Sequence, residues 1–404
     1  MRAVVAGLTA TNAIVAAGSL ITGPLLAQAL GASGRGDLAA ILVPLGLLPP
    51  VLGLGIPAYI YRELPRGRTP SLILGSLAVP LVAIGVIAAL LAAPAAAALA
   101  GGREMVRIFL LIGLAAMPVW LVGRLFQPGL ASLERWRRVI ATTLIPFAVS
   151  LVVVGTGYLT GRLTVALAAA AGLVGTLLAL APGVSLLWEG GRPRFDRRVA
   201  RDGVAFGAKS WVGGIALLLN ARLDQFVMIS AVSPRELGLY AVAASVAGAS
   251  NVFTSAVWPP LMTRVGAGHT HLLAPALRAT LLATLAINAL IALVTPVILP
   301  LLFGPAFHEA VAMTLVLLVG NVFTAGCGVL SAGLQGAGMP LVPSAAEGGA
   351  VAITAVGLLL LLGPLGGLGA AIVSVCAYGT SFVIQLFVSR RRFQHPVNSE
   401  PVIW

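Results

Sequence analysis

Residues 209–234 read KSWVGGIALLLNARLDQFVMISAVSP, an apolar stretch long enough to cross a lipid bilayer that carries Arg222 and Asp224 near its middle. A charge at that depth costs roughly 2.5 to 3.5 kcal/mol on insertion scales, so charged side chains within spans usually face a polar cavity and mark a transport path. The stretch therefore predicts a membrane-spanning helix with a polar interior beside it.

The whole chain has the composition of an integral membrane protein. Of its 404 residues, 59% are hydrophobic and 9% are charged, and the mean hydropathy is +1.03. A hydrocarbon core about 30 Å thick requires about 20 apolar residues per helix, and runs of this size recur along the chain. With Gly, Pro and charged residues as boundaries, they predict an all-α polytopic membrane protein of about 12 transmembrane helices. The expected spans are 3–30, 38–61, 71–99, 108–128, 139–158, 163–187, 210–231, 237–262, 277–302, 310–335, 341–362 and 368–388.

Basic residues are distributed unequally between the two sides of these spans. Because Lys and Arg are retained in cytoplasmic loops, the side that holds most of them is predicted to be cytoplasmic, and both termini lie on it. The net charge of +13 then reflects loops facing an anionic inner leaflet, and no nucleic-acid partner is expected. Lys209 is the only lysine, which suggests a GC-rich bacterial genome and a multi-pass protein of the bacterial plasma membrane. The expected outer side holds only Arg35, Arg103, Arg107, Arg162 and Arg235.

Short motifs recur at corresponding positions of the two halves. The second expected span is preceded by GRGD at 34–37, and the eighth begins with RELG at 235–238. The dipeptide GL occurs at the end of the fourth span, at 129–130, and at the end of the tenth, at 333–334. Two parallel, pseudo-symmetric six-helix bundles explain this repetition, and such halves place a substrate cavity between them. The expected parts are a first bundle at 1–188, a basic cytoplasmic linker at 189–203, a second bundle at 204–390 and a cytoplasmic tail at 391–404.

Four segments resemble one family of transporters. The seventh and eighth helices of Wzx-type polysaccharide flippases are similar to LLNARLDQFVMISAVSPRELGLYAVA at 218–243. The connection between their ninth and tenth helices resembles LLFGPAF at 301–307, and their twelfth helix resembles residues 366–381. The loop after their first helix resembles GASGRGD at 31–37. These flippases belong to the multidrug/oligosaccharidyl-lipid/polysaccharide (MOP) exporter superfamily, with MATE drug antiporters and MurJ lipid II flippases. The resemblance implies that the chain flips an undecaprenyl-diphosphate-linked oligosaccharide by alternating access for cell-surface polysaccharide biosynthesis. It also suggests glycan polymerases or glycosyltransferases as partners.

The candidate substrate-binding residues are cationic or polar side chains inside spans. Arg222 is the first choice, because a guanidinium binds phosphate oxygens bidentately and stays charged. The alternative is a structural ion pair with Asp224, although residues two apart on a regular helix do not face each other. Arg124 lies near the end of its span, where it could instead extend its head group toward the interface. Asn220 and Gln225 complete the predicted set.

Two carboxylates inside spans are candidates for ion coupling. Glu347 lies about 10 Å into its span, at about 1.5 Å rise per residue, among small residues that permit close helix packing. In related lipid II flippases, carboxylates on the seventh and eleventh helices contribute to a cation site, and that resemblance implies that Asp224 and Glu347 bind Na⁺ or a proton. The alternative is a structural pair. No other cofactor, no catalytic residue and no metal site is expected, since His269, His271 and His308 lack metal-ligand spacing.

Two other functions compete with this prediction. A drug or lipid II exporter of the same superfamily has the same architecture, and a drug antiporter favours acidic residues in its cavity. A polytopic glycan polymerase or glycosyltransferase requires catalytic residues on large outer loops, but the expected outer loops are short. Their only acids are Asp37, Glu104, Glu236 and Glu309.

Overall fold

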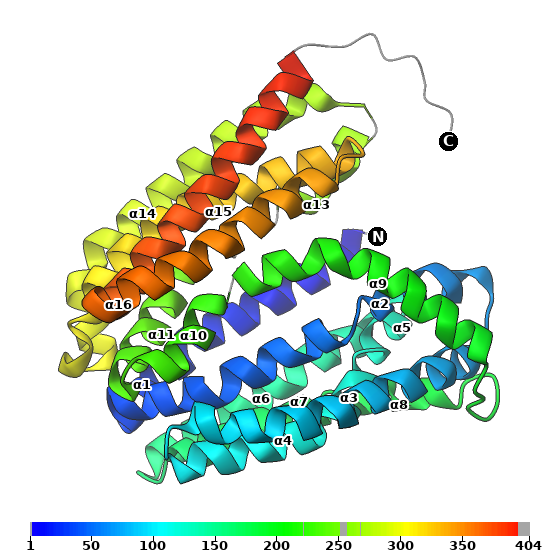
Figure 1. The fold of residues 1–404 in the computed structure, drawn as a ribbon, viewed down its shortest axis with the longest axis horizontal. Coiled ribbons are helices and arrows are strands. Elements are labelled where there is room, and N and C mark those ends of the chain that lie inside the picture. The colour runs from blue at the N-terminus through cyan, green and yellow to red at the C-terminus, as the bar shows by residue number, and fades with distance from the viewer. Residues whose placement is uncertain (1, 221, 251–256, 267, 395–404) are drawn as a thin grey trace.

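The computed structural model describes residues 2–220, 222–250, 257–266 and 268–394, and throughout these ranges the regular structure is helical. Figure 1 shows long helices in two groups that run roughly along the same direction within each group. The helices are α1 (Arg2–Leu52), α2 (Ile56–Glu63), α3 (Pro70–Ala100), α4 (Glu104–Gly123), α5 (Phe126–Ser132), α6 (Trp136–Leu159), α7 (Val165–Leu178), α8 (Ala181–Val184), α9 (Arg197–Asn220), α10 (Leu223–Ala231), α11 (Pro234–Gly248), α13 (Trp258–Gly266), α14 (Leu273–Phe303), α15 (Ala310–Gly336) and α16 (Leu341–Gln394).

The membrane crossings agree with the all-α polytopic prediction. Within the described residues, eight helical segments are long and apolar enough to span a bilayer. α1 contains the expected first span and the larger part of the second, which ends in α2, and α16 contains the expected eleventh and twelfth. The two spans of each helix are separated by kinks at Gly31 (φ 66°) and Gly366 (φ 53°), where a left-handed φ suits glycine. The expected seventh span is broken at Arg222, between α9 and α10. Within the expected eighth span, α11 ends at Gly248 and α13 begins at Trp258, and residues 251–256 between them lie outside the described part of the chain. The helical, polytopic architecture predicted from the sequence is therefore confirmed for the described part of the chain.

The two helix groups meet at one end and diverge toward the other. In Figure 1, α1, α10 and α11 lie where the groups meet, and α13–α16 separate from α2–α8 toward the end that carries α2 and α5. Glycines permit the contact between α1 and α11. A Cβ on Gly36 would lie 1.6 Å from the Pro234 carbonyl oxygen, and one on Gly238 would lie 1.8 Å from that of Ala32. The backbones therefore touch at this end.

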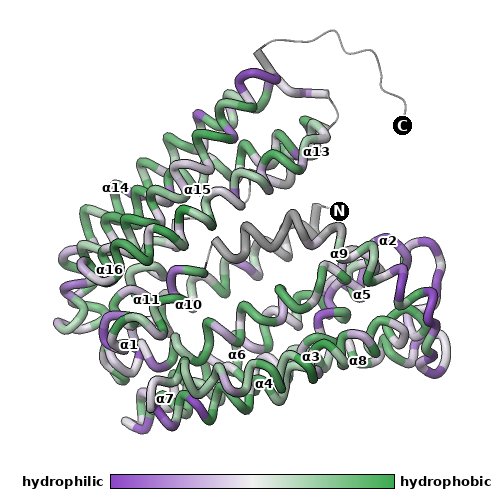
Figure 2. The backbone as a smooth tube through the Cα atoms, viewed as in Figure 1, coloured by the Kyte–Doolittle hydropathy of each residue, from purple (hydrophilic) through white to green (hydrophobic). Residues whose placement is uncertain are grey.

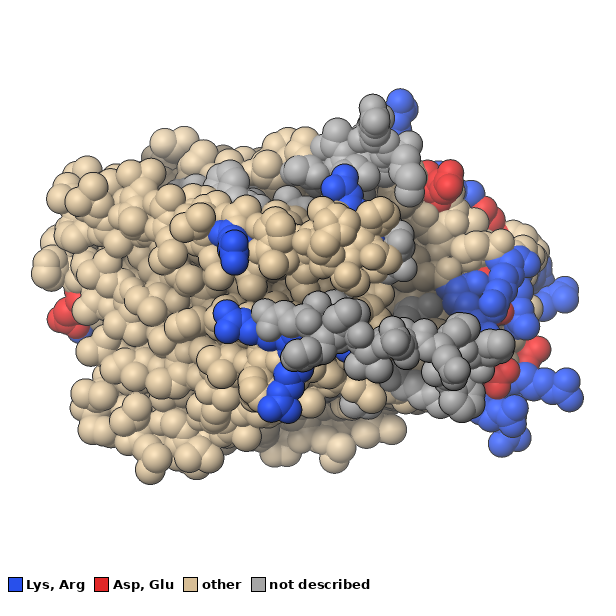
Figure 3. All heavy atoms as spheres, turned by 90° about the horizontal axis from the view of Figure 1, so that it is seen from above, with Lys and Arg blue, Asp and Glu red and all other residues tan. Residues whose placement is uncertain are grey.

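The outer surface is suited to lipid. Figure 2 shows hydrophobic residues along most of the long helices and hydrophilic residues mainly at their ends. Large apolar side chains such as Leu90, Leu159, Leu293 and Leu359 are exposed on it. Figure 3 shows arginines gathered at the end where the helix groups diverge, so this is the end that the charge distribution predicts to be cytoplasmic.

α9 connects the two halves of the chain. It begins at Arg197, inside the range 189–203 that was expected to be linker, and contacts α2 and α3 of the first half as well as α16 of the second. A Cβ on Gly207 would lie 2.5 Å from the Leu54 carbonyl oxygen, so α9 crosses the start of α2 at very short distance. The basic segment is therefore partly a helix that packs on the first half.

Candidate functional site

A polar pocket of about 530 Å³ lies where α1, α10, α11, α15 and α16 converge, and we call it the Arg222 pocket. Its polar side chains come from both halves of the chain. They are Arg35, Arg222, Asp224, Gln225, Tyr240, Ser245, Asn321, Thr324, Ser374 and Tyr378.

Arg222 stands at the break in the seventh span. It is the residue before α10, with φ −143° and ψ −5°, and its exposed side chain lines the pocket. Its Nη1 donates to Gln225 Oε1 at 3.4 Å. Among the described residues, no ion pair within 4.0 Å joins Arg222 to Asp224, so the geometry does not support the simple neutralising pair. The broken helix leaves this guanidinium facing the cavity.

Asp224 is anchored more firmly than Arg222. Its buried carboxylate accepts hydrogen bonds from the Tyr240 hydroxyl, from the Gln225 backbone N–H at 2.7 Å and from Ser374 Oγ at 3.4 Å. These partners lie on α10, α11 and α16. Asp224 thus ties three helices together at the pocket wall, while the side chain of Asn220, also predicted for this site, lies outside the described residues.

Glu347 lies outside the Arg222 pocket and belongs to a second buried network. Its Oε1 accepts from Ser381 Oγ at 2.8 Å, Gln385 Nε2 donates to the same Ser381 hydroxyl at 3.1 Å, and Ser331 Oγ donates to Gln385 Oε1 at 2.8 Å. The structure therefore shows no direct bond between Asp224 and Glu347.

One face of α16 connects the surroundings of the two carboxylates. Ser374, Tyr378, Ser381 and Gln385 recur at the spacing of a single helix face, which runs about 16 Å at about 1.5 Å per residue. Ser374 bonds to Asp224 at one end and Ser381 to Glu347 farther along. We call this set the α16 polar face.

Arg35 is a pocket residue that the sequence analysis placed in an outer loop. The kink at Gly31 lets α1 continue as a helix through this segment, so Arg35 shares a face with Leu38 and Leu42, and all three line the pocket. Its Nε is buried with no hydrogen-bond partner among the described residues. The i, i+3, i+7 spacing of these residues was the signal that could have identified it.

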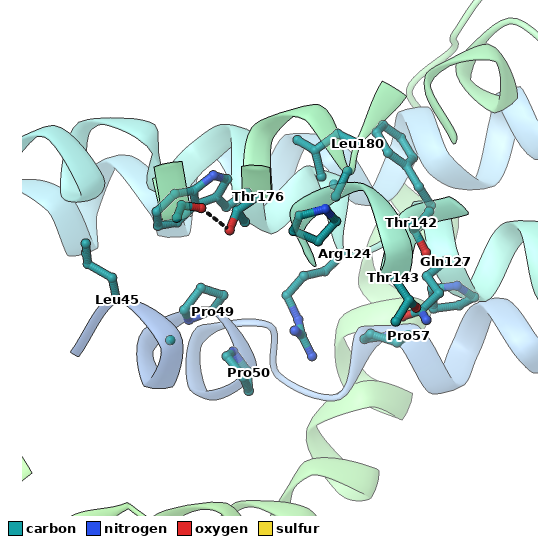
Figure 4. Close-up of a pocket in the computed structure, with 18 of the residues that line it drawn as sticks. Leu45, Pro49, Pro50, Pro57, Arg124, Gln127, Thr142, Thr143, Thr176 and Leu180 are labelled. Carbon is teal, nitrogen blue, oxygen red and sulfur yellow. Dashed lines mark hydrogen bonds between the residues drawn. The ribbon is translucent and has the colours of Figure 1, made fainter. Parts of the chain in front are cut away.

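A second cavity, the Arg124 pocket, lies within the first half. It has a volume of about 590 Å³ and is lined by α1, α2 and α4–α7. Figure 4 shows Arg124 extending from the break between α4 and α5 toward the turn that joins α1 to α2, with Gln127, Thr142, Thr143 and Thr176 nearby. Among the described residues, the Arg124 guanidinium has no hydrogen bond or ion pair, whereas its backbone N–H donates to the Trp120 carbonyl at 3.0 Å.

The two pockets are neighbours with the same sign of charge. Leu42 of α1 lines both, so the two cavities adjoin at this residue. Together the linings hold three arginines and one carboxylate, Asp224, which is already hydrogen-bonded. Within the described chain, no group of three or more His, Cys, Asp or Glu side chains could hold a metal ion. The cavities are suited to an anionic ligand.

This fold, with cavities lined by charged and polar side chains among helices long and apolar enough to span a bilayer, defines a multi-pass membrane protein. Residues 76–312 match the model of the family described as polysaccharide biosynthesis protein; this is more than half of the chain, which therefore belongs to that family. The predicted resemblance to Wzx-type members of the MOP superfamily is confirmed. No curated protein sequence matches the chain significantly.

Solved structures share the fold at low sequence identity. The lipid II flippase MurJ in an inward closed conformation is 13% identical, with a TM-score of 0.76, over 94% of this chain and 87% of that one. An inward-facing multidrug resistance MATE family transporter of the MOP superfamily is 16% identical, with a TM-score of 0.73, over 96% and 98%. An outward-facing MATE structure scores 0.62 at 17% identity, over 97% and 95%.

Proposed function

We propose that this protein flips a lipid-linked, undecaprenyl-diphosphate oligosaccharide across the bacterial plasma membrane, with both termini in the cytoplasm, for cell-surface polysaccharide biosynthesis. The observation that carries the proposal is the excess of arginine in the two neighbouring pockets, where Arg35, Arg124 and Arg222 accompany one hydrogen-bonded carboxylate. A diphosphate head group crossing hydrocarbon requires such a cationic interior, and guanidinium groups bind phosphate oxygens in pairs.

The same charge balance disfavours export of cationic drugs. An organic cation would be repelled by three arginines, and Asp224 is occupied by Tyr240 and Ser374. Lipid II also carries a diphosphate, so membership of the polysaccharide biosynthesis family is what favours an oligosaccharide over a peptidoglycan precursor. The family and the fold also favour transport over glycan polymerisation or glycosyl transfer. Glycan polymerases and glycosyltransferases would then be partners of this protein.

Alternating access would move the two halves, 1–188 and 204–390, against each other. We assign ion coupling to Asp224 and Glu347, with Na⁺ or a proton as the coupling ion. The α16 polar face supports this role, since it joins both carboxylates to one helix of the second half. Protonation or cation binding at Asp224 would change the hydrogen bonds that hold α10, α11 and α16 together. At Glu347 it would change the network that links α16 to Ser331 of α15.

A deletion strain complemented with variants tests the proposal. We expect Arg222→Gln and Arg124→Gln to lose surface polysaccharide and to accumulate lipid-linked repeat units inside, at wild-type membrane levels. Arg162→Gln removes the same charge at an exposed residue away from both pockets and serves as the matched control. Full complementation by both pocket variants would contradict the site assignment, and normal polysaccharide in the deletion strain itself would contradict the function.

A further inference from the structure

Three arginines surround one buried carboxylate where α2 ends, at the arginine-rich end of the molecule. Glu63 is 8% exposed, and its oxygens lie 3.3 Å from Arg62 Nε, 2.9 Å from Arg66 Nη1 and 3.2 Å from Arg68 Nε. The three arginine side chains are 47%, 57% and 48% exposed. We call these four residues the Glu63 cluster.

One carboxylate cannot satisfy three guanidinium groups. Each guanidinium has five N–H donors, whereas a carboxylate offers about four lone-pair sites. The cluster therefore keeps a positive charge and many donors after Glu63 is fully bonded. Such an arrangement of half-exposed arginines matches the oxygens of a phosphate group.

The cluster opens into a cavity of about 460 Å³ between the end of α2 and α9. Besides the Glu63 cluster, its lining consists of Tyr59, Asp202 and Phe206. Arg62 lies over the Phe206 ring at 5.0 Å, and Asp202 lies 3.5 Å from Arg201. Asp202 and Phe206 belong to α9, whereas Arg62 lies in the last turn of α2 and Arg66 and Arg68 follow that helix. A ligand here would therefore contact the end of α2 and α9 together.

The cavity lies at the depth of lipid head groups. α3 starts just after Arg68, and the connection before α9 packs on that start, with the Ser71 N–H donating to the Glu189 carbonyl at 3.1 Å. Trp188 and Phe195 on this connection are exposed. Aromatic side chains at helix ends mark the membrane–water interface.

We propose that the Glu63 cluster is a binding site for the phosphate group of an anionic lipid of the cytoplasmic leaflet. The lipid would join the end of α2 to α9, the helix that connects the two halves of the chain. The site is separate from the Arg124 and Arg222 pockets, because the linings share no residue with it.

Retention of phosphatidylglycerol by the purified protein, measured by native mass spectrometry against phosphatidylcholine, tests the proposal without any transport assay. We expect the double variant Arg66→Gln/Arg68→Gln to retain phosphatidylglycerol at least about tenfold less well than wild type. Arg192→Gln/Arg198→Gln removes the same charge from exposed positions at the same end and should retain it normally. Equal retention by both double variants would overturn the site.

A second variant keeps the test decisive if the first one fails to fold. Glu63→Gln removes the carboxylate and leaves three arginines uncompensated, so we expect its thermal stability to rise with phosphatidylglycerol more than that of wild type. A loss of stability that phosphatidylglycerol does not reverse would make the cluster purely structural. Stabilisation by inorganic phosphate at the same concentration as effectively as by the lipid would overturn the assignment to a lipid.

Discussion

The hydrogen bond between Tyr240 and Asp224 gives the sharpest test of the Arg222 pocket. Tyr240 is fully buried, and its hydroxyl donates to Asp224 and lies 3.4 Å from Ser374 Oγ. The substitution Tyr240→Phe removes the hydroxyl and leaves the ring in place. The measured change therefore reports the hydrogen bond rather than the packing.

The size of the effect depends on the charge of Asp224. A hydrogen bond to a charged group contributes about 1.5 to 3 kcal/mol to stability, whereas interhelical hydrogen bonds in a membrane protein average about 0.6 kcal/mol. We expect Tyr240→Phe to lower the free energy of unfolding by about 1.5 to 3 kcal/mol if the carboxylate is ionised. A loss of about 0.6 kcal/mol would indicate that Asp224 carries a proton.

A double-mutant cycle in detergent micelles makes the test specific. Unfolding free energies of wild type, Tyr240→Phe, Asp224→Asn and the double variant give the coupling between the two side chains, which we expect to be at least about 0.5 kcal/mol. Tyr158→Phe is the control, because its hydroxyl donates to the neutral Gln28 side chain at an exposed site. Strict additivity of the two pocket substitutions would refute the assigned hydrogen bond.

Three further predictions concern other parts of the molecule. Gly238→Val should prevent the α1–α11 contact and lower the free energy of unfolding by at least about 1 to 3 kcal/mol, because even a Cβ at this position would lie 1.8 Å from the Ala32 oxygen. Unfolding measurements check this, with Gly248→Val as the control, since a Cβ there meets nothing within 4 Å. Ser381→Ala should weaken ion-dependent transport while leaving substrate binding intact, because Ser381 Oγ donates to Glu347; unchanged ion dependence would contradict the coupling role. The pKa of Glu309 is lowered by its hydrogen bond to Arg235 at the exposed start of α11. Glu309→Gln should therefore cause a small loss of thermal stability at neutral pH, and this loss should disappear as the pH falls through the lowered pKa of Glu309. A difference in stability that does not depend on pH would argue against the pair.

The candidate site divides into residues that sequence could identify and residues that it could not. Arg222, Asp224 and Gln225 stand out because charges and amides are rare inside apolar spans, and all three line one pocket. Arg35 was missed because a Gly-rich segment next to a charge resembles a loop, whereas the chain passes through the Gly31 kink and continues as a helix. Tyr240 and Ser374 have ordinary sequence contexts, and only the convergence of α11 and α16 on α10 makes them partners of Asp224.

The sequence by itself determined the membrane class, the helical crossings and the family, because apolar length and short motifs are local properties of the chain. Tertiary structure alone decided that Arg124 lines a different pocket from Arg222, that the two pockets share Leu42, and that Asp224 and Glu347 join the same face of α16 without touching. It also decided that α9 packs on the first half, which creates the cavity of the Glu63 cluster. The physical reason is that a charge inside the membrane must find its partners on other helices, and backbone contacts such as Gly36 with Pro234 fix which helices these are.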